Sequence, residues 1–258
     1  MDRNISKRNI IKQSHSLILS EYELSEITLN LLFTLLTEIK NETTDFNEVK
    51  IKIVDIHKKM GFEIKRNNYN KIARELMSNP IKILSEDGTT NYYNWCSRFA
   101  VNTSKGFIQI EIHKELKLHL TKLTENFGIS YLNEFLQIKG MYSKRLYMIF
   151  RKSLKLGKLK ISIEELRIIL KIENKFPLYG DLKRRILIPA MKNISDNSKL
   201  ISGFNEIKSG RKVESIQFIF KLKKENITVS ETNTGITALE EWYKNPLEGT
   251  NIVDCEVI

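Results

Sequence analysis

Residues 136–150 read LQIKGMYSKRLYMIF and begin the second of two similar series of elements in this chain. Tyr142 and Leu146 fall on one helical face, four residues apart, so the stretch predicts an amphipathic helix over Met141–Leu154. A short strand, two further helices and a β-hairpin are predicted after it. The same order of elements is predicted in the first half of the chain, which indicates a structural repeat.

The second half of the chain carries clear start and stop signals. Alternation predicts a short strand at Lys160–Ile163, and Ser162 is placed to cap a helix over Ile163–Leu170. Another helix is predicted over Leu178–Ile194, kinked or shortened by Pro189. Two alternating runs before residue 223 then predict a hairpin.

The first half of the chain gives the same elements. They are a helix after Ser25, a strand at 49–53, helices at Ile56–Met60 and Asn68–Met77, and a hairpin of Tyr92–Val101 with Phe107–Ile112. A helix-turn-helix followed by a β wing is a winged helix, so the predicted fold class is α+β with two tandem winged-helix domains. The predicted domains are residues 1–138, residues 139–224 and an acidic, flexible tail at 225–258.

Positive charge is concentrated in the second predicted domain. Residues 139–224 carry 22 Lys and Arg against 7 Asp and Glu, a net charge of +15, whereas residues 1–138 carry +2 and residues 225–258 carry −6. Charge this concentrated indicates a polyanionic partner, because Lys and Arg contacts to phosphate release counterions. Nucleic acid is the predicted partner, and a generally basic, solvated surface is the alternative.

The composition argues against membrane and secreted classes. No run approaches the roughly 18 apolar residues that span a bilayer, and the first residues lack the apolar core of a signal peptide. Cys96 and Cys255 lie far apart, so no disulfide framework is predicted. The sequence therefore predicts a cytoplasmic protein without a membrane partner.

Motifs for catalysis and metal binding are not found in the sequence. It contains neither a P-loop nor the paired His-x-His motif that rolling-circle nicking enzymes need. His113 and His119 are six residues apart, so on a helix their rings would lie on opposite sides and could not share a metal ion. Both are predicted to be surface residues. We therefore predict no catalytic residue, no metal and no cofactor, and a protein that is not an enzyme.

Several stretches have the order and spacing of a known family. Leu136–Tyr147 is similar to the signature lKSxYsxRLYxLL, with Gly140 where serine is usual. Other matching stretches are residues 10–18, 22–25, 106–110, 116–123, 163–170, 179–190 and 207–213. Together they resemble the Rep_3 (RepB/RepE-type) family of plasmid replication initiators between residues 10 and 220, and the tail lies outside the resemblance.

The resemblance implies sequence-specific binding of double-stranded DNA at repeated origin sites, the iterons, through both winged helices. It implies melting of adjacent AT-rich DNA and recruitment of host helicase or initiator proteins. It also implies a homodimer in equilibrium with the monomer, joined largely through the first domain, that represses its own gene and takes part in plasmid copy control. A winged-helix transcriptional repressor without initiator activity is the main alternative.

A protein that binds single strands or RNA is a third possibility. It would use exposed aromatic side chains as stacking platforms. Tyr92, Tyr93 and Trp95 would suit such a platform, but their position in a predicted strand favours packing in the core.

Base contacts are expected from the second helix of each helix-turn-helix, which enters the major groove. In the second domain the candidates are Lys183, Arg184 and Arg185, since Arg and Lys can pair with guanine. In the first domain they are Asn67, Asn68, Lys71 and Arg74. Asparagine can read adenine, but an ordinary helix cap is the alternative, and phosphate contact is the alternative for the basic residues.

Phosphate contacts are predicted for two further sets of residues. Lys144, Arg145 and Arg151 lie on the helix that leads the second domain. Lys208, Arg211 and Lys212 lie on its wing, where the minor groove is also within reach. Such contacts position a protein on DNA without reading the sequence. For Arg145, a salt bridge that orients the domains is the alternative.

Overall fold

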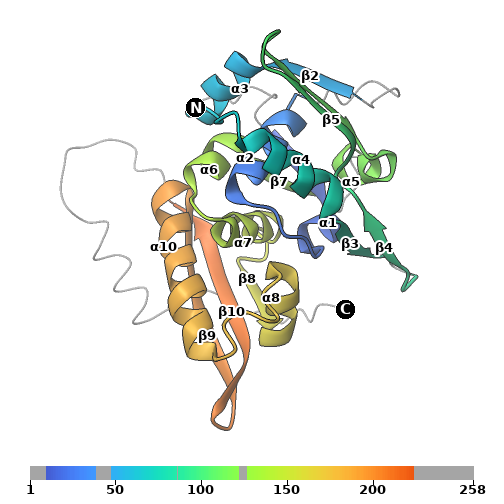
Figure 1. Cartoon of the computed structure of the whole chain (residues 1–258). Coiled ribbons are helices and arrows are strands. Elements are labelled where there is room, and N and C mark those ends of the chain that lie inside the picture. Colours follow the sequence, from blue (N-terminus) through green and yellow to red (C-terminus); the bar gives the residue numbers. More distant parts are fainter. Residues whose placement is uncertain (1–9, 39–47, 86, 122–126, 224–258) are drawn as a thin grey trace, which may run out of the picture. The chain divides into compact units, whose positions relative to one another are not determined.

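The structure, a computed structural model, describes residues 10–38, 48–85, 87–121 and 127–223 (Figure 1). The predicted tail at 225–258 lies outside the described residues. The described residues up to Leu222 belong to one unit, which holds both predicted winged helices. Within the described residues, no helix is long and apolar enough to cross a membrane.

The first winged helix has the predicted order of elements. Its helices are α2 (Glu26–Leu36), α3 (Ile53–Met60) and α4 (Asn68–Ser78), and its antiparallel sheet is β2 (Glu48–Lys52), β6 (Phe107–Ile112) and β5 (Cys96–Asn102) in that order. Gly61 ends α3 with a φ of 75°, a left-handed conformation that glycine adopts without steric cost.

The predicted long strand Tyr92–Val101 is wrong, because two strands of different sheets replace it. β4 (Thr90–Tyr93) pairs with β3 (Ile81–Leu84), and β5 pairs with β6. The chain turns at Trp95. The side chain of this residue is buried, and its backbone N–H donates to the Leu76 carbonyl at 3.0 Å. Core packing is therefore right for Trp95, but Tyr92 is 65% exposed.

A strand at the start of the chain completes the first domain, although the sequence did not predict it. β1 (Ile10–Ser14) pairs antiparallel with β7 (Phe127–Tyr131), and α1 (His15–Leu19) follows. The Ser14 hydroxyl caps α1 by accepting from the Leu17 N–H at 3.2 Å. His119, on α5 (Lys117–Thr121), is not a free surface histidine, because its Nδ1 lies 2.8 Å from Ser14 Oγ.

The second winged helix also has the predicted order. It contains β8 (Lys158–Ser162), α8 (Ile163–Leu170), a recognition segment, and the hairpin of β9 (Leu200–Ser209) and β10 (Lys212–Leu222), with sheet order β8-β10-β9. The capping prediction is confirmed: Ser162 Oγ accepts from the Glu165 N–H at 3.0 Å. The fold is thus the predicted α+β fold with two winged-helix domains.

The recognition segment is a helix in three parts. α9 (Tyr179–Leu182) leads into a π-helical turn, η3 (Lys183–Leu187), and then into α10 (Ile188–Asn197). In the wide turn the Ile188 N–H donates to the Lys183 carbonyl, five residues back. Pro189 lacks an N–H and its ring would clash with the carbonyl four residues earlier in a regular helix. The predicted kink therefore takes the form of a π-turn.

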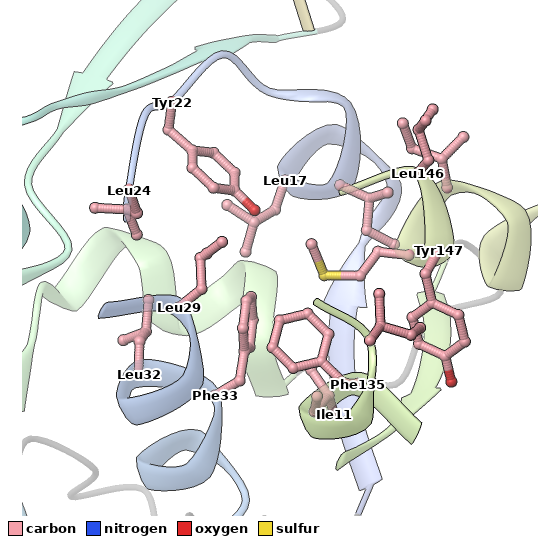
Figure 2. Close-up of a cluster of buried hydrophobic side chains, with 14 of the residues drawn as sticks. Ile11, Leu17, Tyr22, Leu24, Leu29, Leu32, Phe33, Phe135, Leu146 and Tyr147 are labelled. Atoms are coloured by element: carbon pink, nitrogen blue, oxygen red, sulfur yellow. The ribbon is translucent and has the colours of Figure 1, made fainter. Parts of the chain in front are cut away.

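Helix α7 (Met141–Lys152) lies between the two winged helices and is buried on every side from Ser143 to Phe150. It packs against α1 and β7 on one side and against α10 on the other. Figure 2 shows Leu146 and Tyr147 among apolar side chains of the first domain. There Phe33 meets Phe135, on α6 (Leu132–Gln137), edge to face at 4.9 Å between ring centroids.

Candidate nucleic-acid interface

Three consecutive basic residues on the recognition segment project in different directions. Lys183 points toward the wing, where its Nζ lies 2.7 Å from Glu206 Oε1. Arg185 borders a depression that Tyr142 of α7 also lines. Arg184 faces outward with 73% of its side chain exposed, and Asp181 Oδ1 holds its Nη2 at 2.7 Å. Of the three, Arg184 is therefore the best placed to reach a base edge.

Glu206 on β9 ties the recognition segment to the wing. Its Oε1 accepts a hydrogen bond from Tyr179 Oη at 2.8 Å, in addition to the ion pair with Lys183. The hydrogen bond from Lys183 lowers the pKa of Glu206, and the Tyr179 hydroxyl adds to this against the effect of burial. The carboxylate therefore stays charged and fixes the start of the segment against the sheet.

The wing of the second domain presents the predicted cations to solvent. Lys208, Arg211 and Lys212 are all exposed. Gly210 makes the turn with a φ of 58°. Within the part of the chain that the structure describes, Arg211 and Lys212 have no ion-pair partner, so both are available to a phosphate.

In the first domain α4 presents the predicted polar residues. Asn67, Lys71 and Arg74 are exposed, and Asn68 is half-buried. Asn67 occupies the N-cap position of α4, but its side chain makes no capping hydrogen bond. One turn on, Glu75 accepts from both the N–H and the hydroxyl of Ser25, at 2.7 and 2.8 Å, which fixes α4 against the start of α2.

The predicted phosphate contacts of Lys144 and Arg145 are wrong, because both side chains are buried. Lys144 is 0% exposed; its ammonium donates to the Phe135 carbonyl and lies 4.6 Å from the centroid of the Phe135 ring. Burial lowers the pKa of Lys144 to about 8. Helix packing on all sides of α7 leaves neither residue a path to DNA in this structure.

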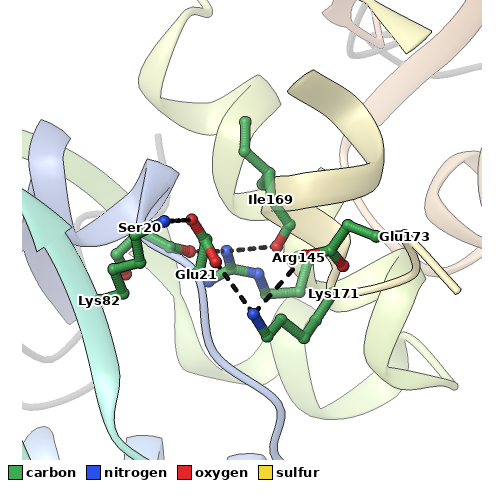
Figure 3. Close-up of polar contacts among 7 residues, drawn as sticks. All are labelled: Ser20, Glu21, Lys82, Arg145, Ile169, Lys171 and Glu173. Atoms are coloured by element: carbon green, nitrogen blue, oxygen red, sulfur yellow. Dashed lines mark hydrogen bonds and ion pairs between the residues drawn. The ribbon is translucent and has the colours of Figure 1, made fainter. Parts of the chain in front are cut away.

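Arg145 lies where the two domains meet, and Figure 3 shows its contacts. Its side chain is 1% exposed, and Nη2 donates to the carbonyls of Ser20 at 2.5 Å and Ile169 at 3.1 Å. The alternative of a domain-orienting residue is thus the better description, with carbonyls in place of a carboxylate. Arg151 is half-buried, its guanidinium 4.5 Å from the centroid of the Tyr131 ring, and its phosphate contact stays a prediction.

Sequence reasoning missed three exposed residues near these sites. Ile188 and Lys192 follow Arg184 at four-residue steps along the outer face of the recognition segment, and Ile188 is 50% exposed. Lys105 is exposed in the β5–β6 turn, the counterpart in the first domain of the Arg211 turn. The four-residue spacing and the equivalent hairpin position were both signals that could have identified them.

Two family profiles match the chain, one after the other along the sequence. The family profile described as "Initiator Replication protein, WH1" matches residues 10–151, and that described as "Initiator Rep protein, WH2" matches residues 162–220. A search of curated protein sequences finds no significant match.

One solved structure shows the likeness in three dimensions. The crystal structure of Pi initiator protein in complex with iteron DNA is similar over 86% of this chain and 100% of that chain, with a TM-score of 0.67 and 18% identity. A structure of domains 2 and 3 of RctB matches 76% of this chain and 80% of that chain, with a TM-score of 0.42 and 17% identity. Because the first profile alone spans more than half of the sequence and the second follows it in order, the chain belongs to the initiator replication protein family.

Proposed function

We propose that this chain initiates plasmid replication by binding repeated origin sites in double-stranded DNA. The observation that carries the proposal is the exposure of basic residues on both parts of the second winged helix: Arg184 faces outward on the recognition segment, and Arg211 and Lys212 are exposed on the wing. A helix in the major groove and a basic wing on the backbone together suit duplex DNA. The Pi initiator, whose fold is similar, was crystallised with iteron DNA.

The finer parts of the proposal rest on the family. Bound at its repeats, the protein recruits host helicase or initiator proteins, and a dimeric form represses its own gene. No catalytic step is proposed for it, and it acts in the cytoplasm. The alternative is a repressor without initiator activity, since the same DNA-binding surface would serve both.

Footprinting on the origin region of the plasmid that encodes the chain tests the proposal, with a random duplex of equal length as competitor. Regularly spaced protection over short direct repeats supports an initiator. Protection of a lone inverted repeat at a promoter supports the repressor instead. Equal binding to the random duplex at physiological salt contradicts sequence-specific recognition altogether.

Substitution of Arg184 by alanine is expected to weaken binding to the protected site by about 1–3 kcal/mol and to relax the sequence preference at one position. The reason is that an arginine paired with guanine loses both hydrogen bonds. Affinities for the site and for all its single-base variants measure the effect. Equal losses on random duplexes would assign Arg184 to a phosphate.

Substitution of Lys212 by alanine is expected to weaken binding to all duplexes alike and to reduce the slope of log K against log salt by about one unit. A phosphate contact releases one counterion whatever the base sequence. Titrations at several salt concentrations measure the slope, and Lys212→Arg, which keeps the charge, is the matched control. A slope unchanged by Lys212→Ala would show that no phosphate lies there.

A further inference from the structure

The turn between α8 and the recognition segment lies against residues 20–23 of the first domain. Lys171 and Lys175 belong to this turn. Lys171 Nζ lies 3.0 Å from Glu21 Oε2, and Lys175 Nζ lies 2.7 Å from Glu23 Oε1. Two ion pairs of the same sense therefore join the second helix-turn-helix to the first domain, and Figure 3 shows the first of them.

Glu21 is itself held firmly within the first domain. Its backbone exchanges two hydrogen bonds with Lys82 of β3, at 3.1 and 2.9 Å, and its Oε1 lies 2.5 Å from Lys82 Nζ. The side chain is only 13% exposed. Burial raises the pKa of Glu21, but the hydrogen bonds from Lys82 and Lys171 outweigh it, so the pKa is lowered. The first domain therefore holds the negative charge of Glu21 in one place, where it pairs with Lys171.

Arg145 makes a second connection between the two domains. Its Nη2 bonds to one carbonyl from each side, that of Ser20 after α1 and that of Ile169 in the last turn of α8. Carbonyls at the ends of helices carry partial negative charge, which suits a guanidinium. The guanidinium also lies 3.7 Å from the centroid of the Tyr22 ring. One buried cation therefore joins the ends of two helices.

The turn that carries Lys171 and Lys175 is stiff. The guanidinium of Arg167 on α8 donates to the carbonyls of Lys175 at 2.9 Å and Phe176 at 2.7 Å. The recognition segment starts three residues after Phe176. A constraint applied to Lys171 and Lys175 is therefore passed to the helix that faces the DNA.

We propose that these contacts, which we call the interdomain clamp (Glu21 with Lys171, Glu23 with Lys175, and Arg145), set the spacing between the two DNA half-sites that one chain reads. The proposal rests on the proposed function, in which both winged helices bind one site. Moving a half-site by one base pair shifts it by about 3.4 Å and rotates it by about 35°. Such a shift lowers the affinity of the chain for DNA only if the two domains are held at a fixed angle to each other.

The clamp residues are thus positioning residues, which need not touch DNA to contribute to specificity. Two modules on one chain bind most tightly when their separation matches the separation of their sites. A loosened pair of domains tolerates more spacings, and it binds each of them less well because the orientation must be fixed on binding.

The test uses the full chain and the duplex that it selects from a random library. Versions of that duplex gain or lose one base pair between the two protected halves. We expect the wild type to lose about tenfold or more in affinity for each altered spacing, and Glu21→Gln to lose about threefold or less. Lys171→Met should behave as Glu21→Gln does, and it keeps the test valid if Glu21→Gln does not fold.

Two controls separate positioning from general stability. Lys82→Met removes the partner of Glu21 inside the first domain but leaves Lys171 in place, so it should keep the wild-type spacing penalty. Exchange of charges in Glu23→Lys with Lys175→Glu should restore a penalty that either single change lowers. Thermal unfolding of each variant shows whether it is folded at the temperature of the binding assay.

The outcomes distinguish the two proposals. If the wild type selects a duplex and covers two halves, but Glu21→Gln and Lys171→Met keep its full spacing penalty, the clamp is overturned and the proposed function stands. A selected site that only one domain covers also overturns the clamp alone. If the wild type selects no duplex sequence at all, sequence-specific recognition fails and the clamp proposal fails with it.

Discussion

Replacement of Lys144 by methionine is expected to stabilise the protein by about 2 kcal/mol at pH 7. The pKa of this buried lysine is about 8, against an ordinary value of 10.5, which corresponds to about 3 kcal/mol lost by keeping the ammonium charged in the fold. Methionine has a similar length and no charge, although the hydrogen bond to the Phe135 carbonyl, worth about 1 kcal/mol, is lost. The difference favours methionine.

The same burial gives the wild type a distinctive dependence on pH. The folded chain releases the Lys144 proton near pH 8, whereas the unfolded chain keeps it until near pH 10.5. Between these values the unfolded state binds more protons, so the free energy of unfolding rises with pH. Urea unfolding of the wild type and of Lys144→Met from pH 7 to pH 10 measures the effect as the difference between the two proteins.

The advantage of Lys144→Met should therefore shrink as the pH rises and vanish near pH 10. The measurements stop at pH 10 because of Tyr147. Burial raises the pKa of this tyrosine in the folded chain, so above pH 10 it ionises first in the unfolded chain, which lowers the free energy of unfolding. Lys144→Arg, which cannot lose its charge, should be less stable than the wild type throughout. If the difference in free energy of unfolding between the wild type and Lys144→Met stayed the same from pH 7 to pH 10, the folded chain would not release the Lys144 proton near pH 8.

The adjacent substitution, Arg145→Met, is expected to have the opposite effect and to destabilise the protein by about 2–4 kcal/mol. It leaves the carbonyls of Ser20 and Ile169 without the donor that the structure gives them, and each buried carbonyl without a partner costs about 1–3 kcal/mol. The contact with the Tyr22 ring is lost as well. Removal of a buried charge offsets part of this loss.

Urea unfolding at pH 7 measures the change, with Arg145→Lys as the matched control. Lysine keeps the charge and can donate to one of the two carbonyls, so it should recover part of the stability. If Arg145→Met were as stable as the wild type, the bonds to Ser20 and Ile169 would contribute nothing beyond the cost of burying the guanidinium.

Local patterns in the sequence were sufficient for elements whose signals lie within a few residues. Ser162 before an apolar run identified the start of α8, and Gly61 identified the end of α3. Both signals act through hydrogen bonds or dihedral angles of neighbouring residues, so they hold wherever the segment lies. The two winged helices could be predicted because they are assembled from such elements in a recurring order.

Contacts between distant residues decided what the sequence could not. The partner of β1 is more than a hundred residues away in β7, and the break at Trp95 exists because this side chain fills the core. The periodicity of the sequence places Lys144 and Arg145 on the polar face of a helix, yet every residue of α7 from Ser143 to Phe150 is buried. Their burial depends on which helices pack around α7, and a single segment carries no record of that.

The π-helical turn also affects how this chain can be compared with its relatives. A regular helix advances about 100° per residue, so one additional residue in a turn rotates everything after it by about that angle. The Ile188 N–H bonds to the Lys183 carbonyl, five residues back, so the segment turns less per residue here than a straight helix does. A base-recognition rule taken from a relative with a straight helix would therefore place the side chains after Leu187 at different angles about the helix axis from those in this chain.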